Sequence, residues 1–244
     1  MTARTVLAFD CAGRALSVAL GRGGGLLAAR REERLRGHGE RLFGLIEELL
    51  AETGLDYPDI DLIAVTRGPG SFTGLRIGLA AARGLALARG RPVFAATTFE
   101  LAMAGVRSAQ RLNRHIVALI DSKRQELFVQ IQAASLDPAD RQTAATPFAA
   151  APEQLHDLLP PGQLLLCGDG AVAALEPLRS RGRDVQAPPE TARLDARWLL
   201  PLAAAADLDR LPTVQPLYLR PPDVTLPKLR DTANGGEGGP GADK

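Results

Sequence analysis

Cysteine, histidine, lysine and aromatic residues are all scarce in this chain of 244 residues. The two cysteines, Cys11 and Cys167, are too few and too far apart for a disulfide scaffold or a zinc site, and this usage is typical of a reducing compartment. The three histidines, His38, His115 and His156, are scattered, and none has a second histidine four residues later. The sequence therefore does not indicate a histidine metal centre, and we expect His38 at an exposed helix start.

An excess of charge of either sign is also missing. Lys and Arg number 29 against 28 Asp and Glu, so the formal net charge of +1 gives no global electrostatic reason to expect nucleic acid binding. No segment is long and apolar enough to span a membrane, because Arg76, Arg83 and Arg89 interrupt the best candidate. Residues 1–4 run directly into an apolar strand, which is unlike a signal peptide. We expect a soluble, cytoplasmic protein.

Apolar periodicity predicts an α/β fold for the first part of the chain. Three short apolar runs separated by polar or glycine-rich turns predict strands, and leucines spaced three and four residues apart predict a helix that starts near His38 and stops at Gly54. Strands and helices then alternate, which gives the order βββαβαβα. The predicted strands are residues 5–10, 16–20, 26–31, 60–65 and 92–96, and the later helices are residues 73–89 and a segment that starts at Thr97.

The second part of the chain repeats the first. Residues 6–10 and the apolar positions of 16–20 align without a gap on residues 117–121 and the apolar positions of 127–131. A glycine turn at 168–170 follows a strand, where the first half has residues 68–70. We therefore expect two related subdomains, residues 1–105 and 106–228, each built on an RNase-H-like mixed sheet flanked by helices. Residues 229–244 are polar, glycine-rich and expected to be disordered, and residues 214–222 are expected to lie extended over the surface.

Two aspartates end the paired strands of this repeat. Asp10 and Asp121 each begin a turn between two strands, and paired hairpins of this kind hold the phosphates of ATP in actin-like proteins. Gly168 and Gly170 would complete such a nucleotide site. A simpler interpretation is that each aspartate caps its own turn through the backbone, and the sequence leaves both open.

The run of residues 68–78, GPGSFTGLRIG, joins a predicted strand to a predicted helix. Its glycines allow a tight turn, and the helix start that follows could hold an anion. It is not a phosphate-binding loop of the common type, since Leu75 stands where that loop requires a lysine. It is not a nucleophile elbow either, because Pro69 and Thr73 occupy the glycine positions of that motif.

Small residues recur every four positions along the helix after this run. A glycine inside a helix costs roughly 1 kcal/mol relative to alanine, so the repeated small residues indicate close packing against another element. That element is either the chain's own sheet or a helix of another chain. The small residues are Gly74, Gly78, Ala82 and Ala86.

Several segments together resemble the TsaB (YeaZ) family. They are residues 6–10 with 17–20, 38–42, 68–78 and 216–220. The resemblance implies a two-domain actin-like (ASKHA) fold. It also implies a non-catalytic scaffold subunit that binds and activates a TsaD-like transferase for threonylcarbamoylation of the tRNA adenosine next to the anticodon.

The resemblance further implies partners and a partner surface. A TsaE-like ATPase is a further expected partner, a homodimer is an alternative assembly, and tRNA is expected only through the complex. No tightly bound cofactor is expected on this chain, and ATP and metal are expected on the TsaD-like and TsaE-like partners. Thr98 and Ala102 stand where the catalytic paralogue has metal-binding histidines, so no catalytic or metal residue is expected. The alternatives are an ATP-dependent kinase that uses Asp10 and Asp121, or a metallopeptidase of the glycoprotease type. The partner surface implied by the family is His38, Leu42, Leu45, Ile46, Leu49, Gly74, Leu75, Gly78, Ala82 and Ala86.

Overall fold

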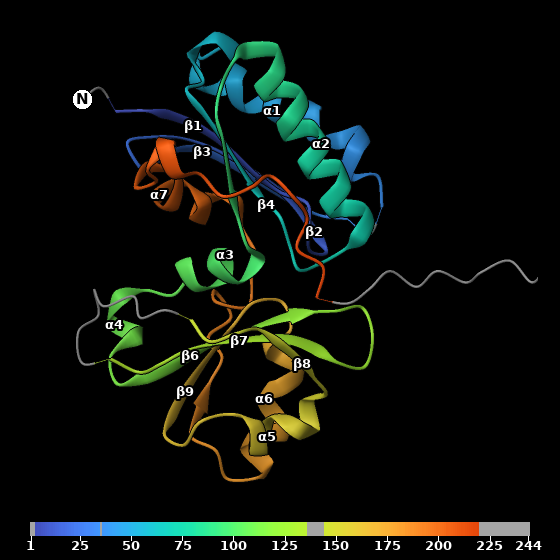
Figure 1. The fold of residues 1–244 in the computed structure, drawn as a ribbon, viewed down its shortest axis with the longest axis vertical. Helices are drawn as coiled ribbons and strands as arrows, with labels where there is room; N and C mark the ends of the chain where they lie inside the picture. Colours follow the sequence, from blue (N-terminus) through green and yellow to red (C-terminus); the bar gives the residue numbers. More distant parts are fainter. Residues whose placement is uncertain (1–2, 35, 136–143, 220–244) are drawn as a thin grey trace, which may run out of the picture.

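Two five-stranded mixed sheets with the same strand order form the framework of the protein (Figure 1). The computed structural model describes residues 3–34, 36–135 and 144–219. In the first sheet the order is β3-β2-β1-β4-β5, and in the second it is β8-β7-β6-β9-β10. The first sheet contains β1 (Thr5–Asp10), β2 (Ala15–Arg22), β3 (Gly25–Glu33), β4 (Leu62–Thr66) and β5 (Val93–Ala96). The second contains β6 (Arg114–Asp121), β7 (Leu127–Gln132), β8 (Phe148–Ala150), β9 (Gln163–Cys167) and β10 (Val185–Gln186).

Strand pairing confirms the internal repeat predicted from the sequence. β1 runs antiparallel to β2 and parallel to β4, and β6 runs antiparallel to β7 and parallel to β9. The two glycine turns occupy the same place in each half, between β4 and α2 and between β9 and α6. The order βββαβαβα of the first half is also confirmed.

The helices begin and end where local chemistry directs them. Gly54 ends α1 in the left-handed conformation, with φ of 67°, and the Ser71 hydroxyl accepts a hydrogen bond from the Gly74 amide at the start of α2. Thr97 and Glu100 form a capping box at the start of α3. The helices are α1 (His38–Thr53), α2 (Phe72–Arg89), α3 (Thr98–Ala104), α4 (Ser108–Arg111), α5 (Leu155–Leu158), α6 (Ala171–Ser180) and α7 (Leu199–Ala204), with 3-10 turns at Tyr57–Asp59, Pro152–Gln154, Ala196–Trp198 and Leu208–Arg210.

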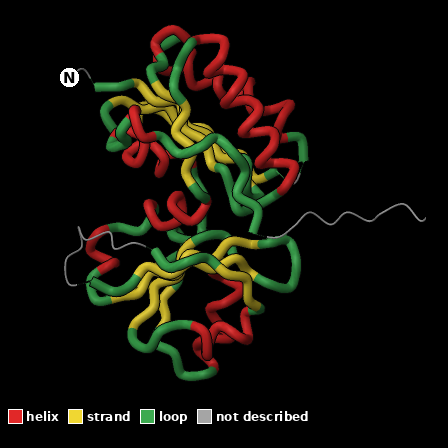
Figure 2. Tube along the Cα trace, viewed as in Figure 1, coloured by secondary structure: helices red, strands yellow, loops and turns green. Residues whose placement is uncertain are grey.

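Buried side chains form three cores between successive layers of the molecule. One core lies between the first sheet and helices α1 and α2. A second lies between the two sheets, where α3 and α7 also contribute, and a third lies between the second sheet and helices α5 and α6. Figure 2 shows this stacking of sheets and helices. In the part of the chain that the structure describes, no helix is long and apolar enough to cross a membrane.

The chain returns to the first sheet after completing the second. Helix α7 packs against β1, β2 and β4, and the Ala196 amide donates to the Ser17 hydroxyl of β2 at 2.9 Å. Residues 214–219 then run along the first half as an extended strap, in which the Leu217 amide donates to the Arg67 carbonyl at 2.6 Å. The sequence-based boundary near residue 105 falls between α3 and α4. The end of the predicted extended segment, at residues 220–222, and the predicted tail, at residues 229–244, lie outside the described residues.

Candidate functional site

The apolar stripe of α1 faces the chain's own core. Leu42, Leu45, Ile46 and Leu49 are fully buried and pack with the first sheet, so these four side chains offer nothing to a partner. The stripe is explained by burial on a sheet, which a surface helix of a globular protein needs. His38 is also buried rather than exposed, and its Nε2 lies 3.0 Å from the Arg34 carbonyl oxygen. The choice of these residues as partner contacts is therefore corrected.

The small-residue face of α2 is likewise used within the chain. A Cβ atom added to Gly74 would lie 2.0 Å from the Cys11 carbonyl oxygen, and one added to Gly78 would lie 3.5 Å from the Cys11 sulfur. Glycine is thus required at position 74 for the approach of α2 to the turn after β1, whereas a methyl group at position 78 would make an ordinary packing contact. Of the alternatives that the sequence left open, the structure supports packing on the chain's own sheet. Leu75 and Ala82 are buried, and Ala86 packs half-buried against the same core.

The opposite faces of α1 and α2 are exposed. The two helices lie side by side (Figure 1), and a Cβ added to Gly39 of α1 would lie 3.7 Å from Ile77 of α2. Two large apolar side chains stand on these outer faces, Phe43 at 43% and Leu87 at 88% exposure. We call the outer-helix face the surface formed by Gly39, Glu40, Phe43, Glu47, Ala80, Arg83, Gly84, Leu87 and Ala88.

An aromatic cluster joins the strap to the first turn of α2. The Phe72 and Tyr218 rings have centroids 5.4 Å apart, and the Arg76 guanidinium lies 3.9 Å from the centroid of the Phe72 ring. The Arg83 side chain also donates a hydrogen bond to the Val214 carbonyl. These contacts hold residues 214–219 against α2, as expected for an extended surface segment.

Asp10 caps its own turn from inside the protein. Its Oδ1 accepts a hydrogen bond from the Ala12 amide at 3.0 Å and another from the Thr66 hydroxyl. The residue is fully buried, and its Oδ2 has no hydrogen-bond partner among the described residues. Burial raises the pKa of Asp10 to about 6, although both hydrogen bonds act to lower it. The carboxylate is thus engaged inside the protein.

Asp121 repeats this turn in the second half. Its Oδ1 accepts a hydrogen bond from the Lys123 amide at 2.7 Å, which is the pattern of Asp10 and Ala12. Its Oδ2 lies 2.8 Å from the Lys123 ammonium and 3.8 Å from the Arg14 guanidinium. Partial burial acts to raise the pKa of Asp121, but the hydrogen bonds and charge of Lys123 outweigh it and lower the pKa. The turn-capping interpretation accounts for both aspartates.

The second glycine turn packs tightly on β6. A Cβ added to Gly168 would lie 2.3 Å from the Leu119 carbonyl oxygen, and the Gly170 amide donates to the same oxygen at 2.9 Å. Between these glycines stands Asp169, which the sequence did not single out as a site residue. Its Oδ1 accepts from the Asp121 amide at 2.9 Å, and burial raises its pKa. The turn therefore links β6 to α6, and a nucleotide-binding role of these glycines stays a prediction.

Thr98 and Ala102 lie buried on α3. The Thr98 amide donates to the Gly68 carbonyl at 2.8 Å, and its hydroxyl has no partner among the described residues. Within the ranges that the structure describes, no three His, Cys, Asp or Glu side chains are grouped so that they could hold a metal ion.

Residues 31–180 match the family model described as TsaD, tRNA N6-adenosine threonylcarbamoyltransferase. The chain is 37% identical over 125 residues to the tRNA threonylcarbamoyladenosine biosynthesis protein TsaB of Escherichia coli (strain K12), which is 50% of this chain and 52% of that protein. It is 45% identical over 65 residues to the tRNA N6-adenosine threonylcarbamoyltransferase of Erythrobacter litoralis, which covers 27% of this chain and 19% of that protein. The matched part thus spans about half the length of the TsaB relative.

Solved structures support the same relationship over a longer range. YeaZ from Pseudomonas aeruginosa superposes with a TM-score of 0.70 at 27% sequence identity and covers 88% of this chain and 100% of that chain. The ethanolamine utilization protein EutJ from Carboxydothermus hydrogenoformans has a TM-score of 0.51 at 9% identity and covers 82% of this chain and 90% of that chain, which shows likeness of fold alone. The predicted actin-like arrangement of two related sheets is confirmed.

Proposed function

The chain belongs to the TsaB (YeaZ) family, within the wider family whose model is described as TsaD, and on that premise we propose that it is a scaffold subunit for threonylcarbamoylation of tRNA. In this proposal the chain binds and activates a TsaD-like transferase, which modifies the adenosine next to the anticodon. The chain has no transferase activity alone, and tRNA meets it only through the complex.

The outer-helix face is the observation that carries the proposal. Exposed Phe43 and Leu87 stand above two long helices whose inner faces are already filled, so these helices are firmly held by their own core. An aromatic or aliphatic anchor on a firmly held surface, ringed by polar residues, is one form of protein contact site. Small residues nearby on α2, Ala80 and Gly84, leave room for another helix to approach. We therefore propose the exposed faces of α1 and α2, rather than their buried faces, as the partner contact.

Size-exclusion chromatography of the chain mixed with the TsaD-type protein of the same organism tests the proposal. We expect a complex with the unmodified chain, and we expect Phe43→Glu and Leu87→Glu to weaken it strongly because each places an uncompensated charge in an apolar contact. Val172→Glu is the matched control, since Val172 is an exposed apolar residue of α6 in the other half, at 69% exposure.

The outcomes separate function from interface. If the unmodified chain forms no complex, the scaffold proposal is wrong. If the complex forms and both glutamate variants bind as tightly as the Val172→Glu control, the function stands and the outer-helix face is the wrong surface. Transferase activity of the chain alone on tRNA would contradict the non-catalytic role.

We also propose that the same face supports self-association. On this face, exposed Glu40 and Glu47 make α1 acidic, whereas exposed Arg83 makes α2 basic. A two-fold axis that sets α1 of one copy against α2 of the other would pair these charges. Sedimentation of the isolated chain should then show a dimer that Leu87→Glu dissociates, and the TsaD-type protein should displace it. A TsaE-like ATPase, the third proposed partner, should join only the mixture that contains both proteins.

A further inference from the structure

One side of α2 carries arginine and aromatic side chains beside the strap (Figure 1). Phe72, Arg76 and Arg83 are spaced by four and seven residues, which places them along one stripe of the helix, and all three are exposed. The strap lies next to them, since the Arg83 side chain donates to the Val214 carbonyl and the Phe72 ring contacts the Tyr218 ring. We call the surface formed by Phe72, Arg76, Arg83 and Tyr218 the arginine ridge.

The positive charge of the ridge is not neutralised by the residues that the structure describes. Helix α2 contains three arginines but no Asp or Glu along its whole length, and the strap carries no charged residue. Neither Arg76 nor Arg83 forms an ion pair within the described ranges. Arg41 on the neighbouring helix α1, by contrast, is paired with Glu32 at 2.8 Å. The ridge is therefore a local excess of positive charge on a chain whose net charge is only +1.

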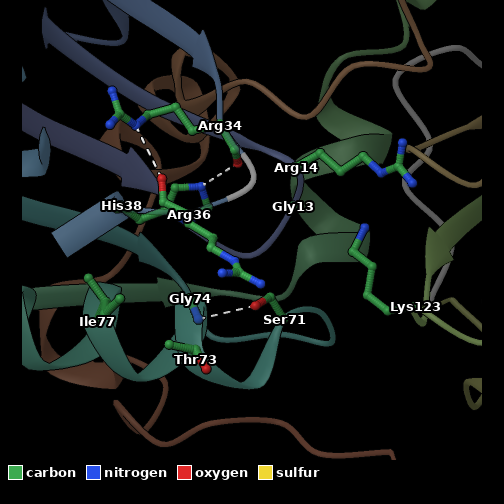
Figure 3. A pocket seen from close by; sticks show the side chains of 11 residues that line it. Gly13, Arg14, Arg34, Arg36, His38, Ser71, Thr73, Gly74, Ile77 and Lys123 are labelled. Carbon is green, nitrogen blue, oxygen red and sulfur yellow. Dashed lines mark hydrogen bonds between the residues drawn. The ribbon is translucent and has the colours of Figure 1, made fainter.

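The ridge holds Arg76 in place while it leaves most of the guanidinium donors free. The guanidinium lies 3.9 Å from the centroid of the Phe72 ring, and its Nε is 3.5 Å from the Tyr218 hydroxyl. Stacking on a ring leaves open the edge of the guanidinium plane, to which the N–H groups point. An amide at the start of the helix is already used within the chain, since the Gly74 amide donates to the Ser71 hydroxyl at 3.2 Å (Figure 3). The ridge thus presents an ordered cation to an incoming acceptor.

We propose that the arginine ridge binds an acidic segment of the TsaD-type partner, with carboxylates of that segment against Arg76 and Arg83. This inference rests on the scaffold function proposed above and names the chemistry of the partner's contact. Guanidinium and carboxylate groups form strong bidentate hydrogen bonds, and Arg and Tyr are enriched among the residues that dominate binding energy at protein interfaces.

The ridge is continuous with the outer-helix face. Arg83 belongs to both surfaces, and Leu87 follows it by one helical turn. A protein segment with apolar side chains beside its carboxylates would cover Phe43 and Leu87 as well as pair with the arginines, whereas the phosphates of RNA would leave these apolar side chains exposed to water. The surface therefore favours a protein partner.

Calorimetric titration of the full chain with the TsaD-type protein of the same organism tests the ridge. At ~50 mM salt Arg76→Gln should weaken binding about tenfold and Arg76→Glu more strongly, and both losses should shrink at ~500 mM salt because salt screens exposed charges. Arg179→Gln and Arg179→Glu, on the exposed side of α6, change the net charge equally and should bind like the unmodified chain. Tyr218→Phe removes the 3.5 Å contact with Arg76 but keeps the ring and the charge, so it should also bind normally.

Carbodiimide cross-linking identifies the group that the ridge contacts. The chain has only three lysines, Lys123, Lys228 and Lys244, so the background of reactive amines is low. In the complex formed by Arg76→Lys, the introduced amine should form an amide with an Asp or Glu side chain of the partner, which mass spectrometry of the digested complex would locate.

The outcomes separate the ridge from the scaffold function. Absence of any complex with the unmodified chain overturns both. A complex that forms with the unmodified chain and binds Arg76→Glu as tightly as Arg179→Glu overturns the ridge and leaves the scaffold function standing. The ridge is also overturned if Tyr218→Phe weakens binding as much as Arg76→Gln, because a loosened strap would then be the cause. Finally, it is overturned if Arg76→Gln leaves the protein complex intact but weakens tRNA binding by that complex, which would make the ridge an RNA contact.

Discussion

Two glycines of the same helix should respond to alanine with opposite signs. Gly74 and Gly84 both lie inside α2, a helix of 18 residues. A Cβ at Gly74 would lie 2.0 Å from the backbone carbonyl oxygen of Cys11, whereas a Cβ at Gly84 would meet nothing within 4 Å. Helix propensity favours alanine at both positions by up to about 1 kcal/mol. The two substitutions therefore differ only in what the added methyl group contacts.

The balance at Gly74 is set by the backbone of the turn after β1. Overpacking costs typically about 1–3 kcal/mol, and a contact with a backbone oxygen falls at the upper end or beyond because no flexible side chain can move away. After subtraction of the propensity gain, Gly74→Ala should lower the free energy of unfolding by about 2 kcal/mol or more. Gly84→Ala should raise it by about 0.4–1 kcal/mol.

Urea denaturation followed by circular dichroism measures both values, and thermal melting provides a second readout. For a chain of this size a change of 1 kcal/mol moves the melting temperature by roughly 2–4 °C, so Gly74→Ala should melt at least about 4 °C lower. If Gly74→Ala were as stable as the unmodified protein, the close approach of α2 to the Cys11 carbonyl would be refuted. Destabilisation by Gly84→Ala would show that its outward face is covered.

Three further predictions concern buried groups and the strap. Because burial raises the pKa of Asp10 from 3.8 to about 6, the folded protein holds a proton on this group between these pH values that the unfolded chain has lost, so the free energy of unfolding falls as the pH rises. The fall between pH 4 and pH 7 should be about 2 kcal/mol in urea denaturation, and Asp10→Asn should lack this contribution. Burial also raises the thiol pKa of Cys11 and raises that of Cys167 to about 12, so iodoacetamide at pH 8 should label neither cysteine until urea unfolds the chain. Labelling of either cysteine in the native protein would contradict its burial. Tyr218→Ala removes the ring contact with Phe72, worth about 0.5–1.5 kcal/mol, and should make the strap more sensitive to limited proteolysis; unchanged cleavage would show that other contacts hold it.

The fold was largely predictable because its periodicities are long and its halves are alike. The capping residues of α1 and α3 set their ends, and the repeated strand pairs identified two related sheets. β8 and β10 were not predicted, since Phe148–Ala150 and Val185–Gln186 are too short to show alternation. The return of α7 to the first sheet was also not predicted, because sequence order alone indicates that it packs on the sheet before it.

The candidate site was less predictable, since a sequence pattern shows that a face is apolar but not what covers it. Leu42 and Gly74 belong to patterns that any closely packed helix would show, and both are buried within the chain. Phe43 and Leu87 carry no pattern of their own, and only the structure identifies them as exposed. The arginine ridge is completed by the strap, which lies far from α2 in the sequence, and no spacing relates Tyr218 to Phe72.

The return of α7 has a consequence for synthesis on the ribosome. The strands of the first sheet emerge early, but the helix that covers their inner face, Leu199–Ala204, is translated only after the whole second sheet. Until then Val6, Ala8 and Leu62 lack part of the apolar surface that buries them. A nascent chain that stalls between the two sheets would therefore expose an incomplete core to chaperones and to other nascent chains.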